Sequence, residues 1–124
     1  MLTTNALVAA DQALIVSTAR ETSVDGVAEM ASTIAAVRSH YNARLTLAGI
    51  TINAYRADRT DRRVWMSQLD NYYGDYVIHP PLPEREAIAA AGTNHRPIPT
   101  LDDAIRQGLT AILNTINSSQ KAHA

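Results

Sequence analysis

The chain has 124 residues, of which 46% are hydrophobic and 19% are charged, and its formal net charge is −1. This composition is that of one globular domain. It excludes a disordered segment or a polycation that coats nucleic acid, so any contact with DNA must come from a local patch. The chain contains no cysteine, which excludes disulfide frameworks, thiolate zinc sites and cysteine nucleophiles.

The sequence carries no targeting pattern at its start. Residues 1–8 lack a basic start and hold only a short apolar stretch. No window approaches the roughly 18 uninterrupted apolar residues that a membrane span needs. We therefore expect a cytoplasmic protein without a membrane contact.

The first predicted elements are a strand and a helix. Residues 13–18 (ALIVST) favour β-structure and predict a buried strand. Thr22 followed by Asp25 resembles a capping box, in which side chains bind the free N–H groups of a helix start. Apolar side chains then recur at helical spacing and predict a helix over residues 23–41. They are Val27, Met30, Ile34 and Val37.

A second strand and helix follow. Residues 45–53 (LTLAGITIN) form a nearly continuous apolar run, which is typical of a strand covered on both faces. Beyond Thr60 we expect an amphipathic helix that ends at Gly74, a residue suited to the conformation found just behind a helix. Its apolar face is predicted to contain Val64 or Trp65, Leu69 and Tyr72.

A proline cluster marks the next elements. Residues 76–79 predict a short third strand that is closed by Pro80, Pro81 and Pro83, since proline cannot donate a hydrogen bond within a sheet. We expect Pro83 to be the first residue of a short helix that ends at Gly92.

The last predicted element is an amphipathic helix. Thr100 and Asp103 form a second capping-box pattern before it. The helix is expected to end near Asn117, and residues 118–124 are predicted to be a disordered tail. Its apolar stripe consists of Leu101, Ile105, Leu109, Ile112, Leu113 and Ile116.

The order of these elements predicts the fold class. Predicted strands alternate with predicted helices, and the strands are apolar throughout. This alternation favours an α/β domain over residues 1–117, with a parallel sheet between helices on both faces.

Six sequence segments, taken in their order along the chain, indicate a family. They are LTTNALVAAD (residues 2–11), an LIV strand, the turn Val24 to Gly26, TIAAVR (33–38), LAGITINAYR (47–56) and PPLPEREAIAAA (80–91). Together they resemble the C-terminal part of the ParA/MinD family of deviant-Walker partition ATPases. The resemblance implies part of a three-layer P-loop NTPase-like domain, with ATP and Mg²⁺ as cofactors. Arg20 and Arg56 depart from the family pattern.

The chain lacks a phosphate-binding loop. Such a loop needs glycines whose N–H groups cradle phosphates, and a lysine that reaches the β- and γ-phosphates. The only lysine is Lys121, and no Gly-Lys pair occurs. We therefore assign no catalytic residue and expect no ATP hydrolysis by the chain alone. A second polypeptide or an N-terminal segment would have to supply the phosphate chemistry.

This absence also has a consequence for packing. In the family the phosphate-binding strand is central, so its absence implies an unpaired sheet edge and an uncovered apolar surface. We expect a homo-oligomer or a partner to cover them. The resemblance further implies a ParB-like centromere-binding partner.

Two segments are candidate nucleotide contacts. By resemblance, Asn53 lies where family members bind adenine, and an amide can both donate to and accept from a base edge. Leu82, Pro83, Glu84 and Arg85 match the family's loop beside the base. Alternatively, Asn53 satisfies local backbone groups and Pro83 merely begins a helix.

Residues 56–63 form a candidate DNA contact with four arginines and two aspartates. The resemblance implies nonspecific binding to DNA phosphates through Arg56, Arg59, Arg62 and Arg63. The alternative is a solvated helix start with local ion pairs, because Asp58 and Asp61 lie between the arginines.

No metal site is predicted. The four histidines are scattered without a pair at i, i+4, and Glu84 and Glu86 would point to different sides of a helix.

The sequence is compatible with two functions. The first is the C-terminal portion of an ATP-binding DNA-segregation ATPase. The second is a non-catalytic, truncated relative that binds a partner through its open sheet edge.

Overall fold

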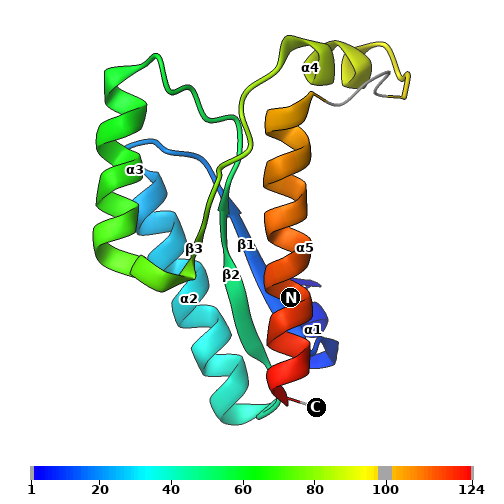
Figure 1. Ribbon diagram of the computed structural model, residues 1–124. Coiled ribbons are helices and arrows are strands. Elements are labelled where there is room, and N and C mark those ends of the chain that lie inside the picture. The colour runs from blue at the N-terminus through cyan, green and yellow to red at the C-terminus, as the bar shows by residue number, and fades with distance from the viewer. Residues whose placement is uncertain (1, 98–101, 124) are drawn as a thin grey trace.

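The computed structural model describes residues 2–97 and 102–123 (Figure 1). Within the described residues, no helix is long and apolar enough to cross a membrane. The elements in chain order are α1 (Leu2–Ala9), β1 (Gln12–Ser17), α2 (Ser23–His40), β2 (Thr46–Ile52), α3 (Thr60–Tyr73), η1 (Gly74–Tyr76), β3 (Val77–Ile78), α4 (Glu86–Thr93) and α5 (Asp103–His123).

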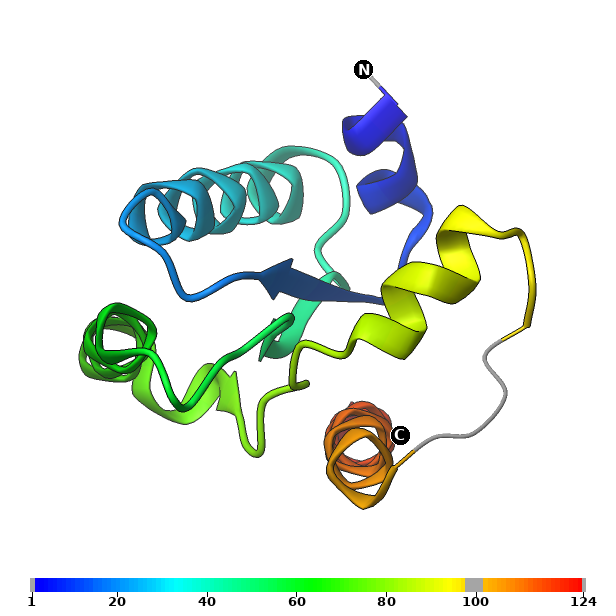
Figure 2. The same cartoon turned by 90° about the horizontal axis from the view of Figure 1, so that it is seen from above.

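The three strands form one parallel sheet in the order β1-β2-β3. Helices α2 and α3 cover one face of this sheet and α5 lies on the opposite face, while α1 packs beside α2 (Figure 2). The predicted α/β fold with a parallel sheet and flanking helices is therefore confirmed.

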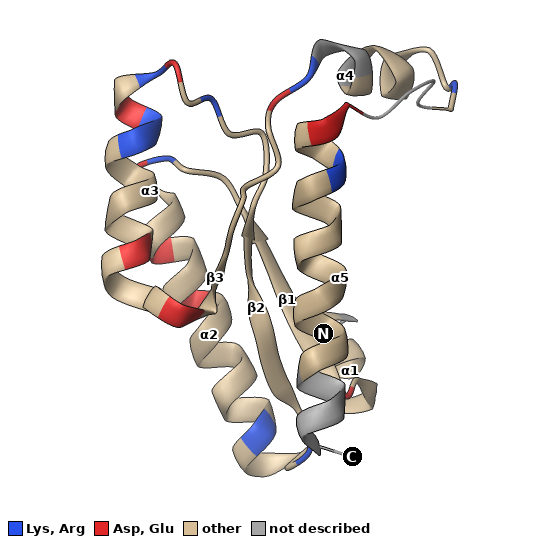
Figure 3. Cartoon of the chain, viewed as in Figure 1, with Lys and Arg blue, Asp and Glu red and all other residues tan. Residues whose placement is uncertain are grey.

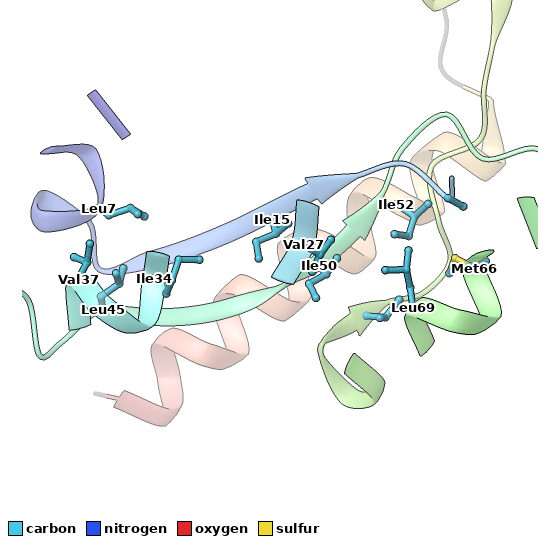
Figure 4. Packing of buried hydrophobic residues seen from close by; sticks show 12 residues of the cluster. Leu7, Ile15, Val27, Ile34, Val37, Leu45, Ile50, Ile52, Met66 and Leu69 are labelled. Atoms are coloured by element: carbon cyan, nitrogen blue, oxygen red, sulfur yellow. The ribbon is translucent and has the colours of Figure 1, made fainter. Parts of the chain in front are cut away.

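The core lies between the central strand and the helices α2 and α3. In β2, Ile50 and Ile52 are completely buried, as is Leu45 just before it. Figure 4 shows side chains of α2 and α3 packed against them, among them Val27 and Leu69. The apolar run of residues 45–53 thus has a physical cause, because among the strands of the described residues only β2 has a neighbour on each side.

The prediction that the first strand is buried is wrong in part. Ile15 is buried toward α2, but the side chain of Val16 is 61% exposed. The reason is the strand order, because β1 lies at the edge of the sheet and is less well covered than β2.

The predicted apolar face of α3 is also wrong in part. Leu69 is buried as expected, but Val64 and Tyr72 are exposed. Trp65, the predicted alternative to Val64, does pack against the core, and Met66 and Tyr73 also contact it. Gly74 ends this helix with a positive φ of 44°, as predicted.

The predicted helix starts differ from the observed ones. Thr22 has helical backbone angles, and its side chain makes no capping bond. Ser23 Oγ instead accepts a hydrogen bond from the Arg20 N–H at 3.0 Å. Thr100 lies outside the described residues, whereas Asp102 Oδ1 accepts from the Ile105 N–H at 3.0 Å and caps α5.

Three element boundaries also differ. The third strand contains only Val77 and Ile78, because Gly74–Tyr76 form a 3₁₀ turn. Helix α4 begins at Glu86, so Pro83 is not its first residue. Helix α5 continues to His123, past the predicted end at Asn117 and through most of the predicted tail.

Gly49 in β2 provides a test of the packing between β2 and β3. A Cβ atom at Gly49 would lie 2.8 Å from Cδ1 of Ile78 and 3.1 Å from the carbonyl oxygen of Tyr76. We predict that Gly49→Ala lowers the free energy of unfolding by about 1–3 kcal/mol through overpacking. Urea unfolding followed by circular dichroism measures this change.

Gly26→Ala in α2 is the matched control, because a Cβ there meets nothing within 4 Å. It should leave stability unchanged or raise it by about 0.5–1 kcal/mol, since alanine favours helix more than glycine. Equal effects of the two substitutions would contradict the packing described for Gly49.

Candidate functional site

An open cleft of about 740 Å³ lies beyond the carboxyl ends of β2 and β3. The cleft lies between two loops, one leading from β2 to α3 and the other from β3 to α4; both can be followed in Figure 1. In open parallel α/β sheets, ligands bind at this end of the strands. The cleft is lined by Tyr55, Arg56, Ala57, Asp58, Pro83, Glu84 and Arg85.

Three backbone hydrogen bonds hold the two loops together. The Leu82 N–H donates to the Ile52 carbonyl at 2.8 Å, and the Tyr55 N–H donates to the Leu82 carbonyl at 2.9 Å. The Glu84 N–H then donates to the Tyr55 carbonyl at 3.0 Å. This pairing resumes the β2–β3 ladder beyond the prolines, with Pro83 bridged to Tyr55.

Ala54 makes a sharp turn between β2 and the paired loop. Its φ of 52° lies in the left-handed region, which residues other than glycine seldom adopt. Such backbone outliers concentrate at ligand sites, where the surrounding structure holds them in place. The three hydrogen bonds on both sides of Ala54 provide that support.

The charges in the cleft neutralise one another. Arg56 Nη2 lies 3.0 Å from Asp58 Oδ2, and Arg56 Nε lies 3.8 Å from Glu84 Oε2. The hydrogen bond with Asp58 raises the pKa of Arg56, and the same bond lowers the pKa of Asp58. With Arg85, the lining holds two cations and two anions, a net charge of zero.

Arg85 connects the cleft to the start of α5. Its Nε lies 2.5 Å from Asp102 Oδ2, while Asp102 Oδ1 caps the helix. Figure 3 shows the charged residues of both loops and of the first turn of α5 at the same end of the molecule. The loop from β3 to α4 is thus fixed to β2 by its backbone and to α5 by one ion pair.

The structure brings together only part of the predicted nucleotide site. Pro83, Glu84 and Arg85 line the cleft. Leu82 lies behind them, where Gly108 of α5 approaches so closely that an added Cβ would be 2.6 Å from Leu82 Cδ2. Asn53 does not line the cleft, and its N–H donates to the Ser17 carbonyl at 2.7 Å.

Four lining residues were not predicted as nucleotide contacts. Tyr55, Ala57 and Asp58 were missed, and Arg56 was predicted to bind DNA instead. Their position directly behind an apolar strand was the signal that could have identified them, because the carboxyl ends of parallel strands share one edge.

The four arginines of the predicted DNA contact do not form one free basic surface. Arg56 is paired with two carboxylates, and Arg63 donates to the Ala57 carbonyl at 2.9 Å. The Arg62 side chain is only 12% exposed. Arg59 is exposed at the start of α3.

A metal site is not apparent in the described part of the chain. No three histidine, aspartate or glutamate side chains gather there. His79 directly follows β3, and its Nε2 lies 2.9 Å from Oδ1 of Asp70 in α3; neither residue lines the cleft.

Comparison with known proteins identifies the fold. No family model matches the sequence, and no curated protein matches it significantly. A structure of cobyrinic acid a,c-diamide synthase from Mycobacterium smegmatis with bound ADP and magnesium is similar, with a TM-score of 0.60 and 24% identity. Its complex with an ATP analogue and magnesium gives a TM-score of 0.57 at 24% identity.

The matched region covers 81% and 82% of this chain, respectively, but 46% of each synthase chain. The chain therefore spans about half the length of these structures. At this identity the likeness establishes a P-loop NTPase-like fold, as predicted, while membership of the ParA family stays a prediction.

The acid sensitivity of the start of α5 tests the role of Asp102. The Ile105 N–H, and after it Arg85, lower the pKa of Asp102 below its ordinary value. A lowered pKa in the folded state stabilises the fold above the unfolded pKa, and this stabilisation is lost as pH falls through the folded pKa. Asp102→Asn should therefore lower the Tm at pH 7. Between pH 5 and pH 3, the Tm of this variant should fall less than the Tm of the parent chain.

Thermal unfolding measured between pH 3 and pH 7 checks this prediction. Asp103→Asn is the control, since it removes a neighbouring carboxylate from the same helix start. Parallel Tm curves for the parent chain and Asp102→Asn would contradict a stabilising role for the charge of Asp102.

Proposed function

We propose that this chain is the base-binding half of an ATP-binding domain of the ParA type, which acts in DNA segregation. The observation that carries the proposal is the cleft formed where residues 82–84 pair with residues 52–55. The fold supports it, because the similar synthase structures contain ADP or an ATP analogue with magnesium.

The cleft suits the base and sugar of a nucleotide. Tyr55 and Pro83 offer flat apolar surfaces, and Glu84 offers a carboxylate that can accept hydrogen bonds from sugar hydroxyls or a base amine. The net charge of zero gives no attraction for a triphosphate. The volume of about 740 Å³ lies in the usual range of small-molecule sites.

The phosphates and Mg²⁺ do not fit this chain. Its single lysine is Lys121, and the described residues offer no cluster of carboxylates for a metal ion. A nucleotide bound in the cleft would thus need another polypeptide segment to hold its phosphates and the Mg²⁺ that supplies charge neutralisation.

The role in DNA segregation is supported by the order of sequence segments between Leu2 and Ile98. The solved neighbours are synthases, so the fold does not by itself favour segregation. The same resemblance suggests a ParB-like partner, and we further propose a cytoplasmic site of action. A second candidate, a non-catalytic interaction module, is favoured by the exposed edge strand β1.

Ligand-dependent stability tests the nucleotide proposal. A ligand that binds only the folded state raises apparent stability, by about 2.7 kcal/mol at 100 times its Kd. Because the cleft has no net charge, we predict that adenosine and ATP raise Tm to a similar extent at millimolar concentration. Differential scanning fluorimetry measures these shifts.

Tyr55→Ala should abolish both shifts, and Tyr72→Ala is the matched control because Tyr72 is exposed on α3. A shift with neither ligand would remove nucleotide binding from the proposal. A shift with ATP alone would place the binding energy at the phosphates and not in this cleft.

A measurement of binding to duplex DNA tests the proposed role in DNA segregation. Arg59 and Arg63 are both exposed and form no ion pair with the described residues, but Arg63 donates hydrogen bonds to the Ala57 carbonyl and the Thr60 hydroxyl, so we predict weak binding that Arg59→Glu abolishes. One phosphate contact implies a slope of about −0.9 in a plot of log K against log salt concentration. Fluorescence anisotropy measures both, and binding that is independent of salt would contradict a phosphate contact.

A further inference from the structure

An exposed row of side chains runs along the outer face of α3. Helix α3 lies at the margin of the molecule, with its inner face toward the sheet (Figures 1 and 2). Val64 is 48% exposed, Tyr72 is 68% exposed, and Gln68 between them is exposed as well. Because residues four apart lie above one another on a helix, these three side chains form one row.

The apolar character of this row is not needed for the core. The buried residues of α3 are Met66 and Leu69, on the other side of the helix. The exposed apolar surface continues behind the helix, where Tyr76 of η1 is 51% exposed. Large apolar side chains gathered on an exposed helix face are typical of a surface that meets another protein.

The charges along α3 are the reverse of those that stabilise an isolated helix. The helix dipole favours anions at the first turn and cations at the last turn. Residues 59–63 hold three arginines and one aspartate, a net charge of +2, whereas residues 64–76 hold two aspartates and no basic residue, a net charge of −2. Most of this charge therefore gains nothing from the dipole of its own helix.

The row and its charges are complementary to themselves in the antiparallel direction. Val64 lies four residues before Gln68 and Tyr72 lies four residues after it. A second α3 that runs the opposite way, with Gln68 beside Gln68, therefore places each Val64 against the Tyr72 of the other copy. The same alignment sets the positive end of each helix beside the negative end of the other.

Arg59 and Asp75 are the charged residues best placed to pair across such a contact. Both are exposed, and neither takes part in an ion pair with the described residues. Arg59 lies nine residues before Gln68 and Asp75 lies seven residues after it. The difference of two residues corresponds to about 3 Å along a helix, which the long side chain of arginine can span.

We propose that the outer face of α3 binds the same face of a second copy of this chain, in an antiparallel pair with a twofold axis at Gln68. The contacts between Val64 and Tyr72 bury apolar surface, and each is formed twice because the two copies use the same patch. The two pairs of Arg59 with Asp75 fix the direction of the helices. This surface is separate from the β1 edge, and its use does not depend on nucleotide binding.

Charge reversal tests the proposed pair. Sedimentation equilibrium of the full chain, without DNA or nucleotide, should show a monomer–dimer equilibrium. Arg59→Glu and Asp75→Arg should each raise the Kd of the dimer by about tenfold or more, because each sets like charges together. An equimolar mixture of the two variants should recover the parent Kd, since each contact in the mixed dimer again joins opposite charges. Arg44→Glu is the matched control, because Arg44 is exposed away from α3.

A single cysteine tests the twofold axis. The chain contains no cysteine, so Gln68→Cys introduces one thiol, which would meet the same thiol of the other copy. With oxidised glutathione this variant should form a disulfide-linked dimer and no larger species. Ser39→Cys on α2, which is also exposed, is the matched control and should form none.

Circular dichroism verifies that each variant keeps its fold. A parent chain that stays monomeric at its highest soluble concentration would overturn the proposal. So would association that neither charge reversal weakens, since the contact would then lie on another surface. A mixture that fails to recover the dimer, or equal crosslinking at positions 68 and 39, would likewise overturn it.

Discussion

The candidate site depends on the backbone pairing of residues 82–84 with residues 52–55. Strand β3 has only two residues, so the ladder could have ended at Ile78. Three hydrogen bonds restart it beyond the proline cluster and hold two loops, some 30 residues apart in sequence, at a fixed separation. The left-handed turn at Ala54 lies within the paired residues 52–55, and Arg85, which pairs with Asp102, directly follows the paired residues 82–84.

The same pairing explains why the cleft is neutral. It places Arg56, which pairs with Asp58 of its own loop, within 3.8 Å of Glu84 of the other loop, while Arg85 pairs with Asp102 at the start of α5. Exposed pairs of this kind add little to stability, but they remove the positive field that phosphates require. The proposed nucleotide would therefore place its uncharged end in this cleft.

Much of the fold could be predicted from local patterns, and much of the site could not. The apolar run of residues 45–53 identified the central strand, and the alternation of elements identified the parallel sheet. The exposure of Val16 depends on strand order, which no local pattern reports. The pairing of Arg56 with Glu84 likewise exists only after folding, so the sequence alone could not predict it.

The most direct test of the central claim is an NMR titration of the ¹⁵N-labelled chain with adenosine. If the paired loops bind the base, the largest amide shifts should occur at Tyr55 to Asp58 and at Glu84 and Arg85. Adenosine has no phosphate, so these shifts would report on the cleft alone. Shifts concentrated on the outer face of α5, around Arg106 and Thr110, or no shifts at saturating adenosine, would contradict the account.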